Sequence, residues 1–146
     1  MVLTATIVML GLLLILPPLR KNNFYMLHAG LVILTAWYLE THFAVSVRPF
    51  HQKILLFLLV LHLIFINLVT FIAYGADKKA AKSGQWRVPE SNLHTLEFLG
   101  GWIGAVLGQK IFHHKSKKRS YQTFFWAMLI FEIGLIFAIL KYLKLI

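Results

Sequence analysis

Apolar residues dominate four long stretches of the chain, and short polar segments connect them. The stretches cover residues 2–16, 24–47, 54–74 and 121–140. A helix needs roughly 20 apolar residues to cross a hydrocarbon core of about 30 Å, and the last three stretches provide them. The first stretch is shorter, and Pro17 and Arg20 follow it instead of a small-residue cleavage site, so we expect a retained helix rather than a signal peptide. The pattern predicts an all-α, polytopic membrane protein with four transmembrane helices.

A polar region, residues 75–120, separates the third and fourth apolar stretches. It contains nine of the fifteen Lys and Arg residues, most of them in two basic segments. Between these segments, Pro89 and Glu90 are typical of a helix start, because proline suits the first turn and an acidic side chain is favourable at the positive end of the helix dipole. We therefore expect a helix over residues 89–112, interrupted by Gly100 and Gly101.

This glycine-broken helix is expected either to turn back within the membrane or to cross it as a fifth span. Each half, about eleven residues, is roughly 16 Å long, which is enough to reach the middle of a bilayer. If the helix turns back, eleven Lys and Arg residues lie on one side of the membrane and four on the other, whereas a crossing helix divides them eight to seven. Because cytoplasmic loops carry an excess of Lys and Arg, the charge distribution favours a re-entrant helix with both basic segments in the cytoplasm.

The composition narrows the class of protein further. Hydrophobic residues make up 59% of the 146-residue chain and charged residues 14%, against roughly 25% charged residues in soluble domains. The chain has no cysteine, which excludes disulfides, thiolate metal sites, iron–sulfur clusters and cysteine nucleophiles. The net charge of +10 indicates contact with anionic lipids at a bacterial inner membrane, and nucleic acid is the weaker alternative because the charge lies beside apolar helices.

Three ionisable side chains share one face of the predicted helix if that helix is continuous. Glu90, His94 and Glu97 are spaced by four and three residues. They could act as acids, bases or metal ligands, and Asp77 in the preceding segment is a further catalytic candidate. The alternative, which we favour, is an interfacial or salt-bridge role, because no further metal ligand is identifiable. We expect no metal site and no cofactor.

Four glycines lie farther along the same predicted helix, namely Gly100, Gly101, Gly104 and Gly108. Three of them, Gly101, Gly104 and Gly108, continue the face of Glu97 at spacings of four, three and four residues. Small residues let two helices approach closely, so we expect a helix-packing surface. The alternative is that the glycines line a site and admit a ligand.

Cationic side chains on both sides of the glycine-broken helix form a candidate binding platform. They are Lys78, Arg87, His114, Lys115 and Lys118. Lysine and arginine side chains bind the phosphate groups of lipid head groups and of phosphorylated small molecules. The alternative is that the basic segments only determine membrane topology. The sequence leaves these two interpretations open.

Polar side chains also interrupt the apolar stretches, at Glu40, His62, Asn67 and Glu132. Ionisable groups at membrane depth face a bundle interior or a water-filled cavity, and they are functional candidates. If the third and fourth long helices run in opposite directions, Glu132 reaches the depth of His62 and Asn67 and can pair with one of them. Such a pair would be a satisfied polar contact, which we favour, or part of a proton relay.

Residues 74–126 resemble the small bacterial membrane proteins of the family called domain of unknown function 1294. The resemblance rests on short motifs, namely Tyr74-x-x-Asp77-Lys78, Arg87-Val-Pro-Glu90, Leu93-His94, Gly100-Gly101-Trp102-x-Gly104 and His114-Lys115-x-x-Lys118 before Tyr121. It implies a polytopic inner-membrane protein and brings no established activity. Some members of the family carry a cold-shock-type nucleic-acid-binding domain. The chain then divides into N-terminal transmembrane helices (1–73), the motif region (74–126) and the remainder of the last transmembrane helix (127–146).

Three functional hypotheses follow from these residues. The first is an accessory inner-membrane protein whose cytoplasmic basic platform binds anionic head groups or phosphates. The second is a small membrane enzyme or transporter acting on a phosphorylated lipid or metabolite, with Asp77, Glu90 or His94 as acid or base. The third and weakest is contact with nucleic acid at the membrane, which the family's cold-shock-type domains suggest. A homo-oligomer that encloses the glycine-broken helix is a further partner hypothesis.

Overall fold

The computed structural model describes residues 6–8, 10, 11, 15, 19, 21–43 and 52–142. The secondary structure of this part of the chain is helical. The elements are α3 (Asn23–Phe43), α4 (Gln52–Ser83), α5 (Glu90–Leu96), the π-helix η1 (Glu97–Gly101), α6 (Trp102–Phe112) and α7 (Arg119–Tyr142). The all-α prediction is therefore confirmed for the described residues.

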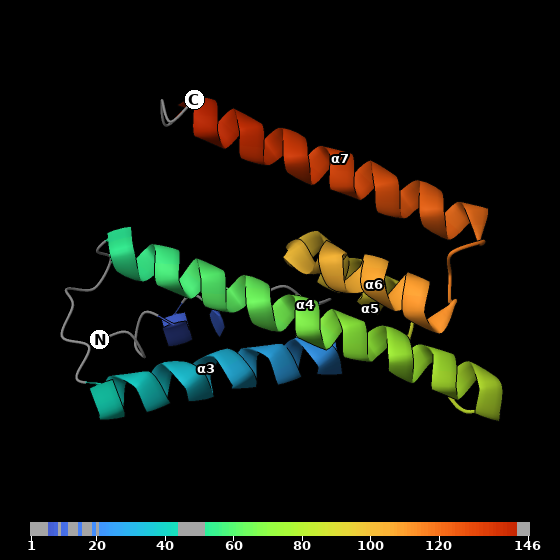
Figure 1. The fold of residues 1–146 in the computed structure, drawn as a ribbon, viewed down its shortest axis with the longest axis horizontal. Helices are drawn as coiled ribbons and strands as arrows, with labels where there is room; N and C mark the ends of the chain where they lie inside the picture. The colour runs from blue at the N-terminus through green and yellow to red at the C-terminus, as the bar shows by residue number, and fades with distance from the viewer. Residues whose placement is uncertain are drawn as a thin grey trace.

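Helix α4 is the longest element, and the other helices are arranged along it (Figure 1). Helix α3 lies on one side and runs antiparallel to α4. Helices α5 and α6 lie against the C-terminal half of α4, and α7 covers them on the side away from α3. The core between these elements contains aromatic and aliphatic side chains, including Tyr25, Ile66, Leu93, Leu96 and Phe125.

The segment from α5 to α6 is a helical hairpin. The hydroxyl of Tyr74 on α4 lies 2.5 Å from the Glu97 carboxylate and 3.2 Å from the Gln109 side-chain amide. Twelve residues of straight α-helix would separate these two positions by about 18 Å. The chain reverses at Gly100, whose φ of 99° lies in the region that favours glycine. Helix α5 therefore runs antiparallel to α4, and α6 returns parallel to it (Figure 1).

Side chains of α4 bind the backbone groups that the reversal frees. His62 Nε2 lies 2.9 Å from the Leu99 carbonyl oxygen, and Asn67 Nδ2 donates to the Gly100 carbonyl oxygen at 3.0 Å. The Gly104 N–H donates to Asn67 Oδ1 at 2.8 Å. Buried backbone groups without partners are costly, so these two side chains stabilise the turn at the tip of the hairpin.

Glycines allow α6 to pack directly against the backbone of α4. A Cβ atom on Gly104 would lie 2.0 Å from the Asn67 carbonyl oxygen, and one on Gly101 would lie 2.2 Å from the Thr70 hydroxyl oxygen. A Cβ atom on Gly108 would lie 2.7 Å from the Tyr74 Cβ. These distances are too short for any side chain, so the close approach of the two helices requires glycine at these positions.

Several expectations about element boundaries need correction. Helix α4 continues nine residues past the predicted apolar stretch and ends at Ser83. The predicted helix over residues 89–112 is present, but the chain reverses at Gly100. Because of this reversal, Glu90, His94 and Glu97 do not share one continuous face with Gly104 and Gly108. The single face was predicted for a continuous helix, which this segment is not.

One described helical segment, Phe57–Ser83, is long and apolar enough to cross a membrane. The described part of the chain therefore does not support the predicted number of four transmembrane helices. Most of the first apolar stretch, residues 2–16, and the end of the second, residues 44–47, lie outside the described residues.

Candidate functional site

A buried carboxylate, Asp77, connects three segments at the C-terminal end of α4. Its side chain is inaccessible to solvent. His114 Nε2 lies 2.7 Å from Oδ2, and the Arg87 guanidinium donates to both carboxylate oxygens at 3.3 and 3.4 Å. Lys115 Nζ lies 3.6 Å from Oδ2. Asp77 thus fixes the segment before α5 and the segment before α7 to the end of α4.

A second carboxylate, Glu90, lies at the first residue of α5 and binds two lysines. Lys115 Nζ donates to Glu90 Oε1 at 2.5 Å, and Lys118 Nζ donates to the same oxygen at 2.7 Å. These hydrogen bonds from Lys115 and Lys118 lower the pKa of Glu90 from 4.5 to about 2. The hydrogen bond to Asp77 raises the pKa of Arg87 in turn. Glu90 is therefore an ionised partner of Lys115 and Lys118 at neutral pH.

The turn between α6 and α7 has an unusual backbone conformation. His113 has a φ of 46° and Lys115 a φ of 62°, in the left-handed region that residues other than glycine rarely adopt. His113 ends α6, and the next N–H, of His114, donates to the Gln109 carbonyl oxygen. This conformation turns His114 and Lys115 inward to the two carboxylates, while Lys117 remains exposed.

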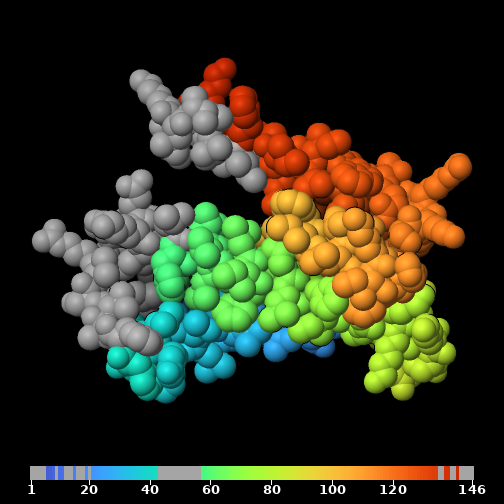
Figure 2. All heavy atoms as spheres, in the orientation of Figure 1, coloured from blue at the N-terminus to red at the C-terminus, as the bar shows by residue number. Residues whose placement is uncertain are grey.

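The cationic groups line a pocket of about 460 Å³ at this end of the molecule. Its walls are formed by Arg87, Glu90, His113, His114, Lys115, Ser116, Lys117 and Lys118. Figure 2 shows this end, where the yellow-green end of α4 lies beside the orange segment that contains the turn. We call this cavity the basic pocket. Four Lys or Arg side chains line it against one carboxylate, and Asp77 lies buried behind it.

A buried hydrogen-bond network lies between the basic pocket and the hairpin tip. The Glu97 side chain accepts hydrogen bonds from the Tyr74 and Tyr121 hydroxyls, each at 2.5 Å. Its other oxygen lies 2.7 Å from His94 Nδ1. A carboxylate only accepts hydrogen bonds, so Nδ1 of His94 carries a proton in this network.

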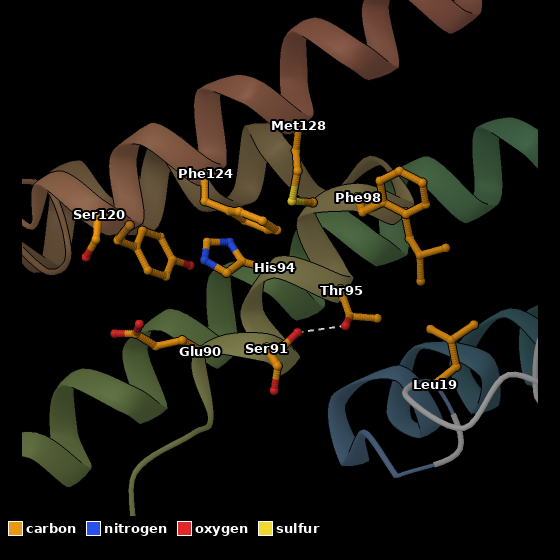
Figure 3. Close-up of a pocket in the computed structure, with 11 residues that line it drawn as sticks. Leu19, Glu90, Ser91, His94, Thr95, Phe98, Ser120, Phe124 and Met128 are labelled. Carbon is orange, nitrogen blue, oxygen red and sulfur yellow. Dashed lines mark hydrogen bonds between the residues drawn. The ribbon is translucent and has the colours of Figure 1, made fainter.

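His94 extends from this network into an open apolar groove of about 770 Å³. Figure 3 shows the imidazole near the centre of the groove, close to Phe124 and Met128 of α7. The ring stacks on Tyr121 with centroids 4.2 Å apart. Among the described residues, none makes a hydrogen bond to His94 Nε2. The contact with Glu97 therefore fixes the orientation of the His94 ring, and Nε2 is left without a hydrogen-bond partner among the described residues.

The three candidate catalytic residues have different surroundings. Asp77 is fully buried and surrounded by cations, and Glu90 is bound to two lysines. His94 lies on the wall of the apolar groove, and no described residue makes a hydrogen bond to its Nε2. Of the predicted binding residues, Arg87, His114, Lys115 and Lys118 line the basic pocket. Lys78 lies outside its walls, and its Nζ is 3.4 Å from the His113 carbonyl oxygen.

The polar residues of the apolar stretches do not form the predicted Glu132 pair. His62 and Asn67 bind the backbone of the hairpin tip instead. Glu132 does reach the same depth, because Oε1 lies 4.0 Å from the Cβ position of Gly100, but no described residue makes a hydrogen bond to it. Glu40 lies half-buried near the end of α3.

Sequence reasoning missed the residues that connect Glu97 to the surface. Besides the two tyrosines, Gln109 Nε2 donates to the Tyr74 hydroxyl, and Gln122 Nε2 donates to Gln109 Oε1 at 2.7 Å. The signal in the sequence was weak, because glutamine and tyrosine near helix ends are common. Glu97 within an apolar stretch was the clearer indication, since a buried carboxylate needs several donors.

Comparison with known proteins identifies relatives of this chain. The profile of a family described as "Protein of unknown function (DUF1294)" matches residues 67–121, which contain the hairpin, both carboxylates and the basic turn. The chain is 35% identical over 75 residues to the uncharacterized protein YsdA of Bacillus subtilis (strain 168). The aligned region covers 51% of this chain and 84% of that protein. No solved structure matches the chain at a significant level.

Proposed function

The chain belongs to the DUF1294 family of proteins of unknown function, and on this premise we propose that it is a multi-pass protein of the bacterial inner membrane whose basic pocket binds phosphate groups. The phosphate belongs to an anionic lipid head group or to a smaller phosphorylated compound. The observation that carries the proposal is the basic pocket itself, a cavity of about 460 Å³ with four Lys or Arg side chains in its walls. Its volume lies within the range of small-molecule sites.

Large exposed apolar side chains support the membrane location. Leu34 on α3 is 62% exposed, Ile64 on α4 is 59% exposed, and Ile130 and Phe131 on α7 are 69% and 61% exposed. Water-soluble proteins rarely expose extended apolar surface of this kind, whereas lipid chains cover it without cost. Helices α3 and α7 therefore accompany α4 across the bilayer in this proposal.

The hairpin supports the proposal that the two basic segments lie on the same side of the membrane. Because α5 and α6 reverse at Gly100, Glu90 and Phe112 lie at the same end of α4. The positive-inside rule assigns this end to the cytoplasm. In the bilayer the hairpin re-enters from the cytoplasmic side, and α4 and α7 shield its irregular tip from lipid.

Charge complementarity supports phosphate as the ligand. Lys117 and Lys118 are exposed at the pocket wall, and the Arg87 side chain is 51% exposed although it contacts Asp77. Arginine and lysine form charge-assisted hydrogen bonds to phosphate oxygens. The carboxylates bind only part of the positive charge, so the pocket keeps a net positive charge for an incoming anion.

A titration of purified protein with glycerol 1-phosphate, followed by ³¹P NMR, tests this function. We expect the double variant Lys117→Gln/Lys118→Gln to weaken binding at least fivefold. The matched control Lys79→Gln/Lys82→Gln removes the same charge from exposed positions on α4 outside the pocket. Equal weakening in both variants would show a general charge effect, and absence of binding to the native protein would refute the proposal.

The orientation of His94 favours a second candidate function, an enzyme that acts on a phosphorylated amphiphile. Glu97 holds Nδ1 at 2.7 Å, and Nε2 lines the apolar groove as a general base. Incubation with dihexanoyl phosphatidate, monitored by ³¹P NMR, tests this candidate. Turnover that is lost in a folded His94→Gln variant would support catalysis, and an unchanged spectrum with the native protein would contradict it.

A further inference from the structure

The apolar groove and the basic pocket share a wall residue. Glu90 lines both cavities, and its carboxylate is bound to Lys115 and Lys118 of the basic pocket. The two cavities therefore adjoin at the N-terminus of α5. A ligand that fills both must be anionic at one end and apolar at the other.

The groove itself becomes more apolar with distance from Glu90. In Figure 3, Glu90 and Ser120 lie at one end of the groove, and Phe98 and Leu19 lie at the other. Phe124 and Met128 of α7 cover the middle. Since α5 and α7 both start at the basic end, the apolar end of the groove extends toward the hairpin tip, which is the direction in which a lipid chain enters a bilayer.

We infer that the ligand is a single phosphate-headed lipid, with its head in the basic pocket and one hydrocarbon chain in the groove between α5 and α7. This inference rests on the proposed function and names the class of its ligand. The phosphate group competes with the Glu90 carboxylate for Lys115 and Lys118, because both anions use the same ammonium groups. The chain contacts Phe98, Phe124 and Met128, while ordinary bilayer lipid covers the outer faces of the helices.

Two probes with related phosphate heads separate the contributions of head and chain. They are glycerol 1-phosphate, which has no chain, and dihexanoyl phosphatidate, which has two short chains, each titrated into protein in a non-ionic detergent. We expect dihexanoyl phosphatidate to bind at least tenfold more tightly. Dihexanoyl phosphatidylcholine has the same chains with a zwitterionic head, and we expect it to bind at least tenfold more weakly than dihexanoyl phosphatidate.

A groove-filling variant then locates the chain. Ser91 is an exposed residue of the groove wall, so Ser91→Trp places an indole in the groove at a position that tolerates a larger side chain. We expect Ser91→Trp to bind dihexanoyl phosphatidate no more tightly than glycerol 1-phosphate. Its affinity for glycerol 1-phosphate should equal that of the native protein. Ser83→Trp, at an exposed position outside the groove, should keep both affinities. Met128→Trp fills the groove from the opposite wall and replaces Ser91→Trp if thermal melting shows that the latter is unfolded.

The results distinguish this inference from the function on which it rests. The inference is wrong, and the phosphate pocket stands, if glycerol 1-phosphate binds as tightly as dihexanoyl phosphatidate. The same holds if the folded groove variants still bind dihexanoyl phosphatidate more tightly than glycerol 1-phosphate. If neither phosphate compound binds, the proposed function fails and the inference fails with it. Tighter binding of dihexanoyl phosphatidate that Ser91→Trp abolishes and Ser83→Trp preserves is the result that establishes the groove as the chain site.

Discussion

At the scale of single residues, burial separates the roles of two carboxylates that look alike in the sequence. Asp77 and Glu90 both lie in basic surroundings, and both were candidates for an acid or base. Asp77 is fully buried and contacts Arg87, His114 and Lys115, whereas the Glu90 side chain is 39% exposed and binds two lysines at the pocket wall. Asp77 is therefore a structural anchor, and Glu90 is the carboxylate that a phosphate bound as we propose would displace from Lys115 and Lys118.

Replacement of these two residues should have unequal effects on stability. Asp77→Asn leaves Arg87 and Lys115 without their buried counter-charge, and loss of one partner from a buried charge cluster costs about 3–5 kcal/mol. Glu90→Gln removes more exposed ion pairs, which contribute about 0–1 kcal/mol. Thermal melting of the purified variants measures the difference. Equal stability of the two variants would contradict the assigned roles.

The lowered pKa of Glu90 predicts how its contribution to stability depends on pH. A carboxylate whose pKa is lower in the folded state stabilises that state fully above its unfolded pKa of 4.5. The stabilisation decreases as the pH falls from 4.5 toward about 2, where folded Glu90 becomes protonated. The difference in melting temperature between native protein and Glu90→Gln should thus be constant from neutral pH to about pH 5 and then shrink. A difference that grows in acid would contradict the Lys115 and Lys118 contacts.

At the scale of elements, the hairpin is the feature that the sequence predicts in part. Gly100 and Gly101 within an apolar helix indicate a break, and the charge distribution favours a helix that turns back. The sequence could not identify the residues that stabilise the turn, because His62 and Asn67 lie more than thirty positions away on α4. Their polarity within an apolar stretch was visible, but their partners are backbone groups, which carry no signature in the sequence.

Two glycines on different helices test the close packing of the hairpin against α4. Gly104→Ala places a Cβ atom 2.0 Å from a backbone oxygen of α4, so the helices must separate, and we expect a loss of about 3 kcal/mol or more. Gly30→Ala on α3 meets nothing within 4 Å, and its better helix propensity should raise stability by up to about 1 kcal/mol. Thermal melting of both variants checks these opposite signs, and a stable Gly104→Ala protein would disprove the close contact.

The turn before α7 provides a further test at this scale. His113 ends α6 in a left-handed conformation that glycine adopts without strain. His113→Gly should therefore raise the stability by about 0.5–1 kcal/mol if this exposed histidine has only a structural role. A decrease in melting temperature would show that the imidazole makes a contact that outweighs the backbone strain.

At the scale of the whole molecule, the chain combines an apolar bundle with a polar end that contains the Lys, Arg, Asp and Glu residues of the family motifs, while the motif glycines lie at the hairpin tip. The sequence was sufficient to predict the helical class, and four of the five predicted binding residues line the pocket wall, the exception being Lys78. It was not sufficient to predict the pocket, because Asp77, Glu90 and the turn at residues 113–118 come together only when the hairpin reverses. Tyr74, Gln109 and Tyr121 meet for the same reason, since three separate helices supply them.

The basic pocket requires both basic segments to face the same side of the membrane. The absence of native cysteine allows a direct measurement on Ser83→Cys and Ser116→Cys, introduced one at a time. Both positions are exposed at the polar end, one at the last residue of α4 and one in the turn before α7. Labelling with a membrane-impermeant maleimide should modify both cysteines in inverted inner-membrane vesicles and neither in intact spheroplasts. Modification of the two cysteines from opposite sides would mean that the glycine-broken helix crosses the bilayer, and it would contradict the shared basic pocket.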